Sequence, residues 1–221
     1  MNCTGFDSPI YYRSMNQLDK NMLDKSNNSD AKTEQVTFFN CARQYCVCFV
    51  DIVDSTKNTC DIYGSDKIQG YYSTFLNTMS SIIKMHNGRV IKNSGDGLLY
   101  YFPKTVDSKN ELAFQYVLDC GLAMIEANKS INQNFTQKGL SSVCYRISAN
   151  YGKVELAMSV NSHNVDLFGP PVNICSKINH LASSNEMIVN SDLFEVLKNT
   201  SFYQEYSFRA LEKNFEGRNS N

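Results

Sequence analysis

A predicted β-hairpin between Asn87 and Phe102 constrains the fold of this chain more than any other stretch. Its sequence is NGRVIKNSGDGLLYYF. The turn, residues 95–97, contains an Asp-Gly step between two runs of strand-forming residues, which is a strong signal for a tight hairpin turn. Asp96 therefore stands at the tip of a rigid turn. It would suit a hard metal ion if a second carboxylate lay beside it.

A second carboxylate stands at the end of a predicted central strand. Residues 45–51 (YCVCFVD) are almost continuously apolar, which predicts a strand that is covered on both faces. Asp51 is the last residue of this run. If the strand pairs beside the hairpin, Asp51 and Asp96 meet at one edge of the sheet, where two carboxylates repel each other unless a cation lies between them. Taken singly, a strand-end Asp and a turn Asp need no function.

The remaining elements are expected from hydrophobic periodicity and from turn residues. A helix before the hairpin has apolar residues three and four positions apart and ends near Gly88. A second helix begins after Ser108, which stands at capping-box spacing from Glu111. The expected buried positions of the two helices are Ile68, Tyr72, Phe75, Met79 and Ile82, and then Ala113, Val117, Cys120, Met124 and Ile131.

Two strands (142–150 and 153–160) follow the second helix, and a third helix begins at Pro170-Pro171. A short strand (187–189), a short helix (191–198) and a last strand (202–208) complete the chain. The order β-α-β-β-α-β predicts an α+β fold with a ferredoxin-like core, helices packed on one face of the sheet, and extra C-terminal strands and helix.

Size and composition fit one globular domain plus additional chain. The sequence has 221 residues, of which 42% are hydrophobic and 19% charged. Residues 1–40 are poor in aliphatic side chains, which predicts a flexible polar leader, with a regulatory or dimer-contacting arm as the alternative. Residues 41–200 form the predicted main domain, and residues 201–221 form a terminal strand and tail.

Charge and cysteine usage exclude several classes of partner. A net charge of −1 provides no bulk attraction to nucleic acid or to an anionic membrane. No apolar run approaches the roughly 20 residues of a membrane span. The eight cysteines and three histidines lack the spacing of a zinc site, so buried thiols in a reducing compartment are expected. We therefore expect a cytoplasmic protein without nucleic-acid or membrane partners.

Three blocks of sequence together resemble the catalytic domain of class III nucleotidyl (adenylate/guanylate) cyclases. They are FVDIVDST (49–56), GRVIKNSGDG (88–97) and DLFGPPVNICSK (166–177). The blocks occur in the order and spacing of that family, and the resemblance covers roughly residues 45–189. The family has a ferredoxin-like core. Its members convert a nucleoside triphosphate to the 3′,5′-cyclic monophosphate and pyrophosphate, so the resemblance implies this reaction.

The resemblance implies two Mg²⁺ or Mn²⁺ ions in each active site, held by Asp51, Asp96 and the backbone carbonyl of Ile52. Backbone N–H groups after the first strand would bind phosphate oxygens. These residues are Val53, Asp54, Ser55 and Thr56, and Asp54 stands where the family usually has glycine. The family also places a late lysine on the triphosphate, and Lys213 is the candidate here.

Base choice and catalysis follow from four further positions in the resemblance. Lys92 and Asp166 match the residues that face the base. A lysine that donates to N1 and a carboxylate that accepts from N6 fit adenine, whereas guanine presents the reverse pattern. Asn173 matches the residue that orients the ribose. Lys177 matches a transition-state arginine, and lysine keeps the charge but lacks the bidentate fork.

The resemblance also implies a head-to-tail homodimer with shared active sites, in which a monomer is inactive. One protomer would supply Asp51 and Asp96, and its partner the other four side chains. We therefore predict an adenylate cyclase that converts ATP to cyclic AMP. One alternative is a weak or silent cyclase-like module that binds nucleotide or a partner, which Lys177 motivates. Others are a cyclase for GTP or a pyrimidine triphosphate and, more distantly, a ferredoxin-like RNA binder.

Overall fold

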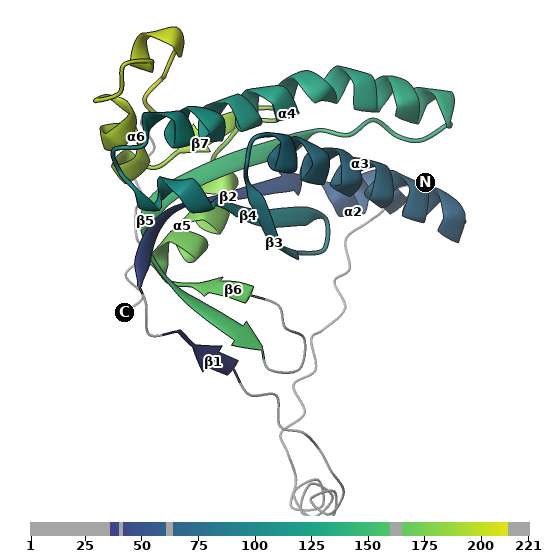
Figure 1. Cartoon of the computed structure of the whole chain (residues 1–221). Coiled ribbons are helices and arrows are strands. Elements are labelled where there is room, and N and C mark those ends of the chain that lie inside the picture. The colour runs from purple at the N-terminus through teal and green to yellow at the C-terminus, as the bar shows by residue number, and fades with distance from the viewer. Residues whose placement is uncertain (1–35, 40–41, 61–63, 160–164, 212–221) are drawn as a thin grey trace, which may run out of the picture. The chain divides into compact units, whose positions relative to one another are not determined.

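The computed structural model describes residues 36–39, 42–60, 64–159 and 165–211 (Figure 1). All of them belong to one compact unit, Val36–Asn221. The described residues include neither residues 1–35 of the predicted leader nor Lys213. The proposed domain boundaries remain a prediction.

One seven-stranded sheet forms the centre of the domain (Figure 1). Its strand order is β1-β5-β2-β4-β3, and β6 and β7 also pair with β5. The central strand β2 pairs antiparallel with both β4 and β5. The predicted ferredoxin-like α+β core is therefore confirmed. The strands are β1 (Val36–Phe38), β2 (Arg43–Ile52), β3 (Arg89–Asn93), β4 (Gly97–Phe102), β5 (Tyr145–Ser159), β6 (Val165–Phe168) and β7 (Met187–Val189).

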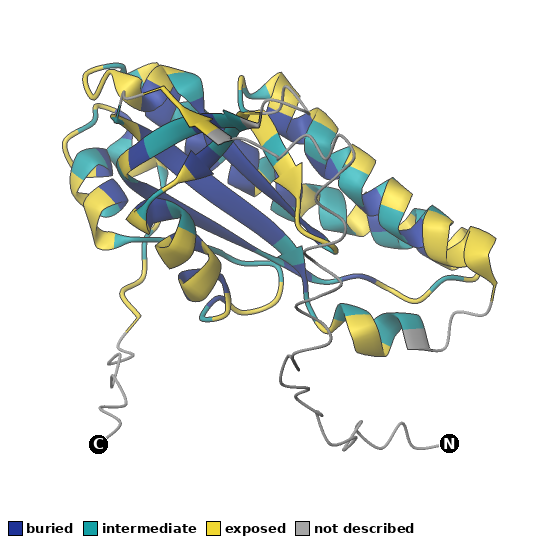
Figure 2. Cartoon of the chain, turned by 90° about the horizontal axis from the view of Figure 1, so that it is seen from below, coloured by how far each residue is buried: buried dark blue, intermediate teal, exposed yellow. Residues whose placement is uncertain are grey.

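The prediction that helices pack on one face of the sheet is wrong, because helices cover both faces of the central strand. Figure 2 shows the buried sheet between them. Alternate apolar residues of β2, including Val50, pack in the main core with α3 and α4. The apolar residues between them, including Phe49, pack on the other face in a second cluster with Cys175 of α5. This double coverage explains the continuous apolar run. The helices are α2 (Ser55–Cys60), α3 (Ser65–Met85), α4 (Glu111–Gln137), α5 (Pro170–Asn179) and α6 (Ser191–Leu197), with 3₁₀ turns at Pro103–Val106 and Tyr203–Glu205.

Three predicted strands near the C-terminal half differ in the structure. The two strands expected over residues 142–160 are one 15-residue strand, β5. Gly152 lies in the gap that was expected between the two strands. It allows β5 and α5 to pack closely, because an added Cβ would lie 2.8 Å from Cγ of Pro171 in α5. The strand expected over residues 202–208 is replaced by the 3₁₀ turn Tyr203–Glu205.

Local details of the two long helices also differ from the prediction. Asn110, not Ser108, caps α4, because the Asn110 side chain accepts a hydrogen bond from the Ala113 N–H at 3.2 Å. Glu111 accepts hydrogen bonds from Ser201 instead of completing a capping box. In α3 the buried stripe includes Tyr71 rather than Tyr72, and Ile68 is exposed.

None of the helices in the described ranges combines the length and the apolar character that crossing a bilayer requires.

Candidate active site

The structure brings the two carboxylates of the predicted metal site together at the end of β2. Asp51 is paired with Gly97 in the β2–β4 register, and Asp96 directly precedes Gly97 in the hairpin turn. The Ile52 N–H donates to the backbone carbonyl of Asp96 at 3.4 Å, which ties the turn to the strand end.

Gly97 allows this close approach. A Cβ at this position would lie 2.6 Å from the Val50 carbonyl oxygen and 2.8 Å from Asp51 Oδ1. Contacts this short cannot be relieved by a side-chain rotation, because the nearest atom belongs to the backbone of the central strand. Glycine is therefore required at position 97 for space, while Gly95, with a φ of 73°, provides the left-handed conformation of the turn.

The Gly97→Ala variant is expected to lose at least about tenfold in metal-dependent activity and about 1–3 kcal/mol of stability, because the added methyl displaces the Asp51 carboxylate and overpacks the strand pair. Gly70→Ala is the matched control, since a Cβ on Gly70 in α3 meets no atom within 4 Å. Thermal unfolding and initial rates measure the two effects. Full activity in Gly97→Ala would contradict the role assigned to this close approach.

Burial and the neighbouring carboxylate together raise the pKa of Asp51 to about 7. Burial of the side chain is the largest cause, followed by the charge of Asp96 and a hydrogen bond between the two carboxyl groups, while Arg146 acts in the opposite direction. The Asp51 carboxyl therefore titrates near neutral pH.

The donor set fits Mg²⁺ or Mn²⁺ that shares its coordination with substrate. Across the described ranges, no cluster of three or more His, Cys, Asp or Glu side chains could hold a metal ion by itself. Asp54, the extra carboxylate near this site, therefore does not complete a protein-only cage. A pair of carboxylates with a nearby backbone carbonyl is what Mg²⁺ uses when phosphate oxygens supply further ligands.

Arg146 is a site residue that the sequence reasoning missed. It lies directly across from Asp51 in the β2–β5 register, so the two side chains share one face of the sheet. Its Nε is buried and has no hydrogen-bond partner among the described residues. The charge of Arg146 acts on the Asp51 carboxyl, so a positive group lies beside the carboxylates. The alternation of Tyr145, Arg146 and Ile147 indicates which face of the strand Arg146 occupies, but not that Asp51 lies across from it.

The segment after β2 forms the start of a short helix. The Val53 N–H donates to the Cys144 carbonyl at 2.8 Å, so it is used within the fold. Of the four backbone N–H groups that were expected to bind phosphate, those of Asp54, Ser55 and Thr56 therefore remain as candidates. Ser55 and Thr56 are the first residues of α2, where N–H groups have no partner within the helix.

Asp54 has a φ of 51°, in the left-handed region that favours glycine. This conformation gives a physical reason for glycine at the matching position of the cyclase family. Asp54 is exposed, so its carboxylate would repel a triphosphate bound where the resemblance predicts it.

Asp54→Gly is expected to lower KM for the triphosphate about threefold or more, because it removes a like charge beside the phosphates. Its stability should change by less than about 1 kcal/mol, since relief of the left-handed strain offsets the entropy of glycine. Asn87→Gly is the control, because Asn87 has a similar φ of 60° at the end of α3. An unchanged KM in Asp54→Gly, or an equal decrease in Asn87→Gly, would contradict this assignment.

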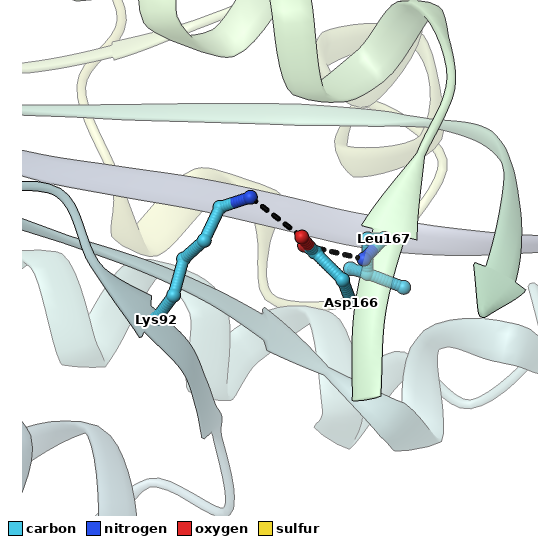
Figure 3. Close-up of polar contacts among 3 residues, drawn as sticks. All are labelled: Lys92, Asp166 and Leu167. Carbon is cyan, nitrogen blue, oxygen red and sulfur yellow. Dashed lines mark hydrogen bonds and ion pairs between the residues drawn. The ribbon is translucent and has the colours of Figure 1, made fainter. Parts of the chain in front are cut away.

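Lys92 and Asp166 lie together, as Figure 3 shows. Lys92 Nζ is 2.7 Å from Asp166 Oδ2, and Oδ1 of the same carboxylate accepts a hydrogen bond from the Leu167 N–H at 2.8 Å. The two side chains are 50% and 31% exposed. Asp166 lies on β6, which pairs with β5.

The two remaining predicted residues project from α5. Asn173 and Lys177 are exposed, and neither side chain bonds to another described residue, whereas Cys175, Ile178 and Asn179 of the same helix are buried. Asn173 and Lys177 are thus presented to solvent or to a partner.

Comparison with known proteins agrees with this geometry. The family model for the adenylate and guanylate cyclase catalytic domain matches residues 40–217. A Rhizobium meliloti (strain 1021) protein named "Putative adenylate cyclase 3" is 25% identical over 117 residues. The match covers 53% of this chain but only 17% of that relative.

Solved cyclase structures share the fold. The guanylyl cyclase Cya2 aligns with a TM-score of 0.65 at 20% identity, covering 71% of this chain and 79% of that chain. The adenylyl cyclase CyaB from P. aeruginosa aligns with a TM-score of 0.65 at 18% identity, covering 75% and 83%. Adenylyl and guanylyl cyclases are both among these neighbours.

Proposed function

Because this chain belongs to the adenylate and guanylate cyclase catalytic domain family, we propose that it is an adenylate cyclase, which converts ATP to 3′,5′-cyclic AMP and pyrophosphate. The observation that carries the choice of ATP is the 2.7 Å ion pair between Lys92 and Asp166. An ammonium donor and a carboxylate acceptor held side by side complement the N1 acceptor and the N6 donor of adenine. Guanine would place its O6 acceptor against the carboxylate.

The carboxylate pair is the proposed metal site. Asp51, Asp96 and the carbonyl of Ile52 would hold two Mg²⁺ or Mn²⁺ ions, which lower the pKa of the ribose 3′-hydroxyl and offset triphosphate charge when bound. Asp51 and Asp96 also fix where the 3′-hydroxyl can lie, because they belong to a central strand and a tight turn. Both are held by backbone pairing.

The chain's cationic and N–H groups account for the rest of the proposed chemistry. Arg146 and the N–H groups at the start of α2 bind phosphate oxygens, Asn173 orients the ribose, and Lys177 offsets charge at the α-phosphate. The 3′-oxygen forms a bond to the α-phosphorus as the bond to pyrophosphate breaks. With a lysine in place of the family's arginine, one point charge replaces a two-pronged contact, which predicts a modest turnover.

We place the active site between two protomers arranged head to tail. Asn173 and Lys177 on α5 support this arrangement, because both are exposed and bond to no other side chain in the described ranges, so they are available to a second chain. Each homodimer would contain two equivalent sites.

Incubation with each of the four nucleoside triphosphates and Mg²⁺ or Mn²⁺, with products identified by mass, tests the function. Cyclic AMP should be the main product. The double variant Lys92→Glu/Asp166→Cys should shift kcat/KM toward GTP by at least about tenfold, because the donor and acceptor pattern is changed. Lys104→Glu, an exposed lysine in the 3₁₀ turn after β4, is the charge control.

Each other outcome has a definite meaning. Nucleotide binding without any cyclic product would replace the proposal with a silent nucleotide-binding module. Cyclic GMP or a cyclic pyrimidine nucleotide as the main product would replace ATP as the substrate. An unchanged base preference in the double variant would remove Lys92 and Asp166 from the base site.

A further inference from the structure

We propose that Asn179 is a positioning residue that fixes the orientation of helix α5, and with it Asn173 and Lys177, against the sheet. This inference rests on the proposed function. It concerns a residue that contacts no substrate in that proposal.

Asn179 lies at the end of α5 and is completely buried. Its Nδ2 donates to the Phe49 carbonyl at 3.3 Å and to the Arg146 carbonyl at 3.2 Å, and lies 3.4 Å from Ser148 Oγ. Because both carbonyls can only accept, the amide nitrogen must face them. The amide therefore spans the β2–β5 strand pair next to Asp51.

A second polar contact lies one helical turn away on the same face of α5. Ser148 Oγ donates to the Cys175 carbonyl at 2.8 Å. Cys175 and Asn179 are four residues apart, so they share a helix face. Asn173 and Lys177 share the opposite face, because a shift of two residues turns the helix by about 200°. The buried contacts thus set the direction in which Asn173 and Lys177 project.

Stability alone does not account for an asparagine at this position. Its Oδ1 is buried and has no hydrogen-bond partner in the part of the chain that the structure describes. An unsatisfied buried acceptor opposes folding, and an apolar side chain of similar size would remove that cost. The amide instead determines the position of α5, because its two donated hydrogen bonds hold the end of the helix at one place over the strands.

The helix, rather than the sheet, should move when these bonds are lost. Strand β2 is paired with β5 through ten residues and with β4 through six. Helix α5 has ten residues and packs through one face. Loss of Asn179 should therefore displace Asn173 and Lys177 while Asp51 stays in place.

The test begins with Asn179→Leu. We expect an unfolding temperature equal to or above that of the wild type, and a kcat lowered at least about tenfold with little change in KM, since misplaced groups act on the transition state. Asn132→Leu is the control. Asn132 exchanges hydrogen bonds with the Val143 backbone, so its loss should lower the unfolding temperature and leave kcat unchanged. Full activity in Asn179→Leu, or a loss of activity that only follows a lower unfolding temperature, would overturn the proposal.

Mixed dimers show which element moves. In a heterodimer of Asp51→Ala and Lys177→Ala protomers, the one intact site takes α5 from the Asp51→Ala protomer. Asn179→Leu added to that protomer should lower activity at least about tenfold, whereas the same change in the Lys177→Ala protomer should have no effect. A loss in the latter protomer would overturn the proposal. A wild-type chain without cyclic product would refute the proposed function as well, whereas an active wild type with an active Asn179→Leu refutes only this inference.

Discussion

Co-expression of two inactive variants, Asp51→Ala and Lys177→Ala, should restore activity to about a quarter of the wild-type level. Random pairing makes half of the dimers mixed, and each mixed dimer has one intact site out of two. Each variant alone should retain at most about one hundredth of the wild-type rate, because every site then lacks either a metal ligand or the catalytic cation. The measurement is cyclic AMP formation per protomer, with differently tagged chains.

The matched control pairs Asp51→Ala with Asp96→Ala. Both residues belong to the same half of a site, so every site in the mixed dimer still lacks one carboxylate, and no activity should return. Restored activity in this control, or none in the first mixture, would contradict the proposed sharing of sites between protomers.

Without divalent cations, the thermal stability of the protein should fall as pH rises from about 4 toward 7. Asp51 has a pKa of about 7 in the folded chain, against 3.8 as its ordinary value. In this window the folded state holds a proton that the unfolded state releases, so rising pH favours unfolding, and the effect levels off above pH 7. Added Mn²⁺ should reverse the trend, because it binds the ionised carboxylates and stabilises the protein more at pH 8 than at pH 5.

Unfolding temperatures measured across this pH range, with chelator and with Mn²⁺, test the prediction. Asp51→Asn should lose most of the pH dependence and most of the stabilisation by Mn²⁺. Asp66→Asn, on the exposed start of α3, should keep both. A Mn²⁺ effect that does not depend on pH, or one that survives in Asp51→Asn, would argue against the carboxylate pair as the cation site.

The centre of the fold could be predicted because its signals are local. The apolar run of β2 and the Asp96-Gly97 turn each specify their structure within a few residues. Strand β6 could not be predicted in this way, because its four residues pair only where β5 extends beyond β2. The two strands expected over residues 142–160 are one strand because Tyr151 and Gly152, which lie between them, continue the pairing with β2.

The site was predictable to the extent that its residues lie in recognisable motifs. Asp51 and Asp96 could be placed together from a strand end and a turn. Arg146 was missed because its position depends on the register between β2 and β5, which no short motif specifies. The role that we propose for Asn179 was equally hidden, since burial at a helix end depends on what packs over it.

Mn²⁺ binding, followed by electron paramagnetic resonance in the presence of an ATP analogue that cannot cyclise, tests most directly whether the acidic pair holds cations. We expect two Mn²⁺ ions per protomer for the wild type and for Lys177→Ala. Asp51→Asn and Asp96→Asn should each lose at least one of them. Unchanged stoichiometry and affinity in both aspartate variants would contradict the proposed metal site.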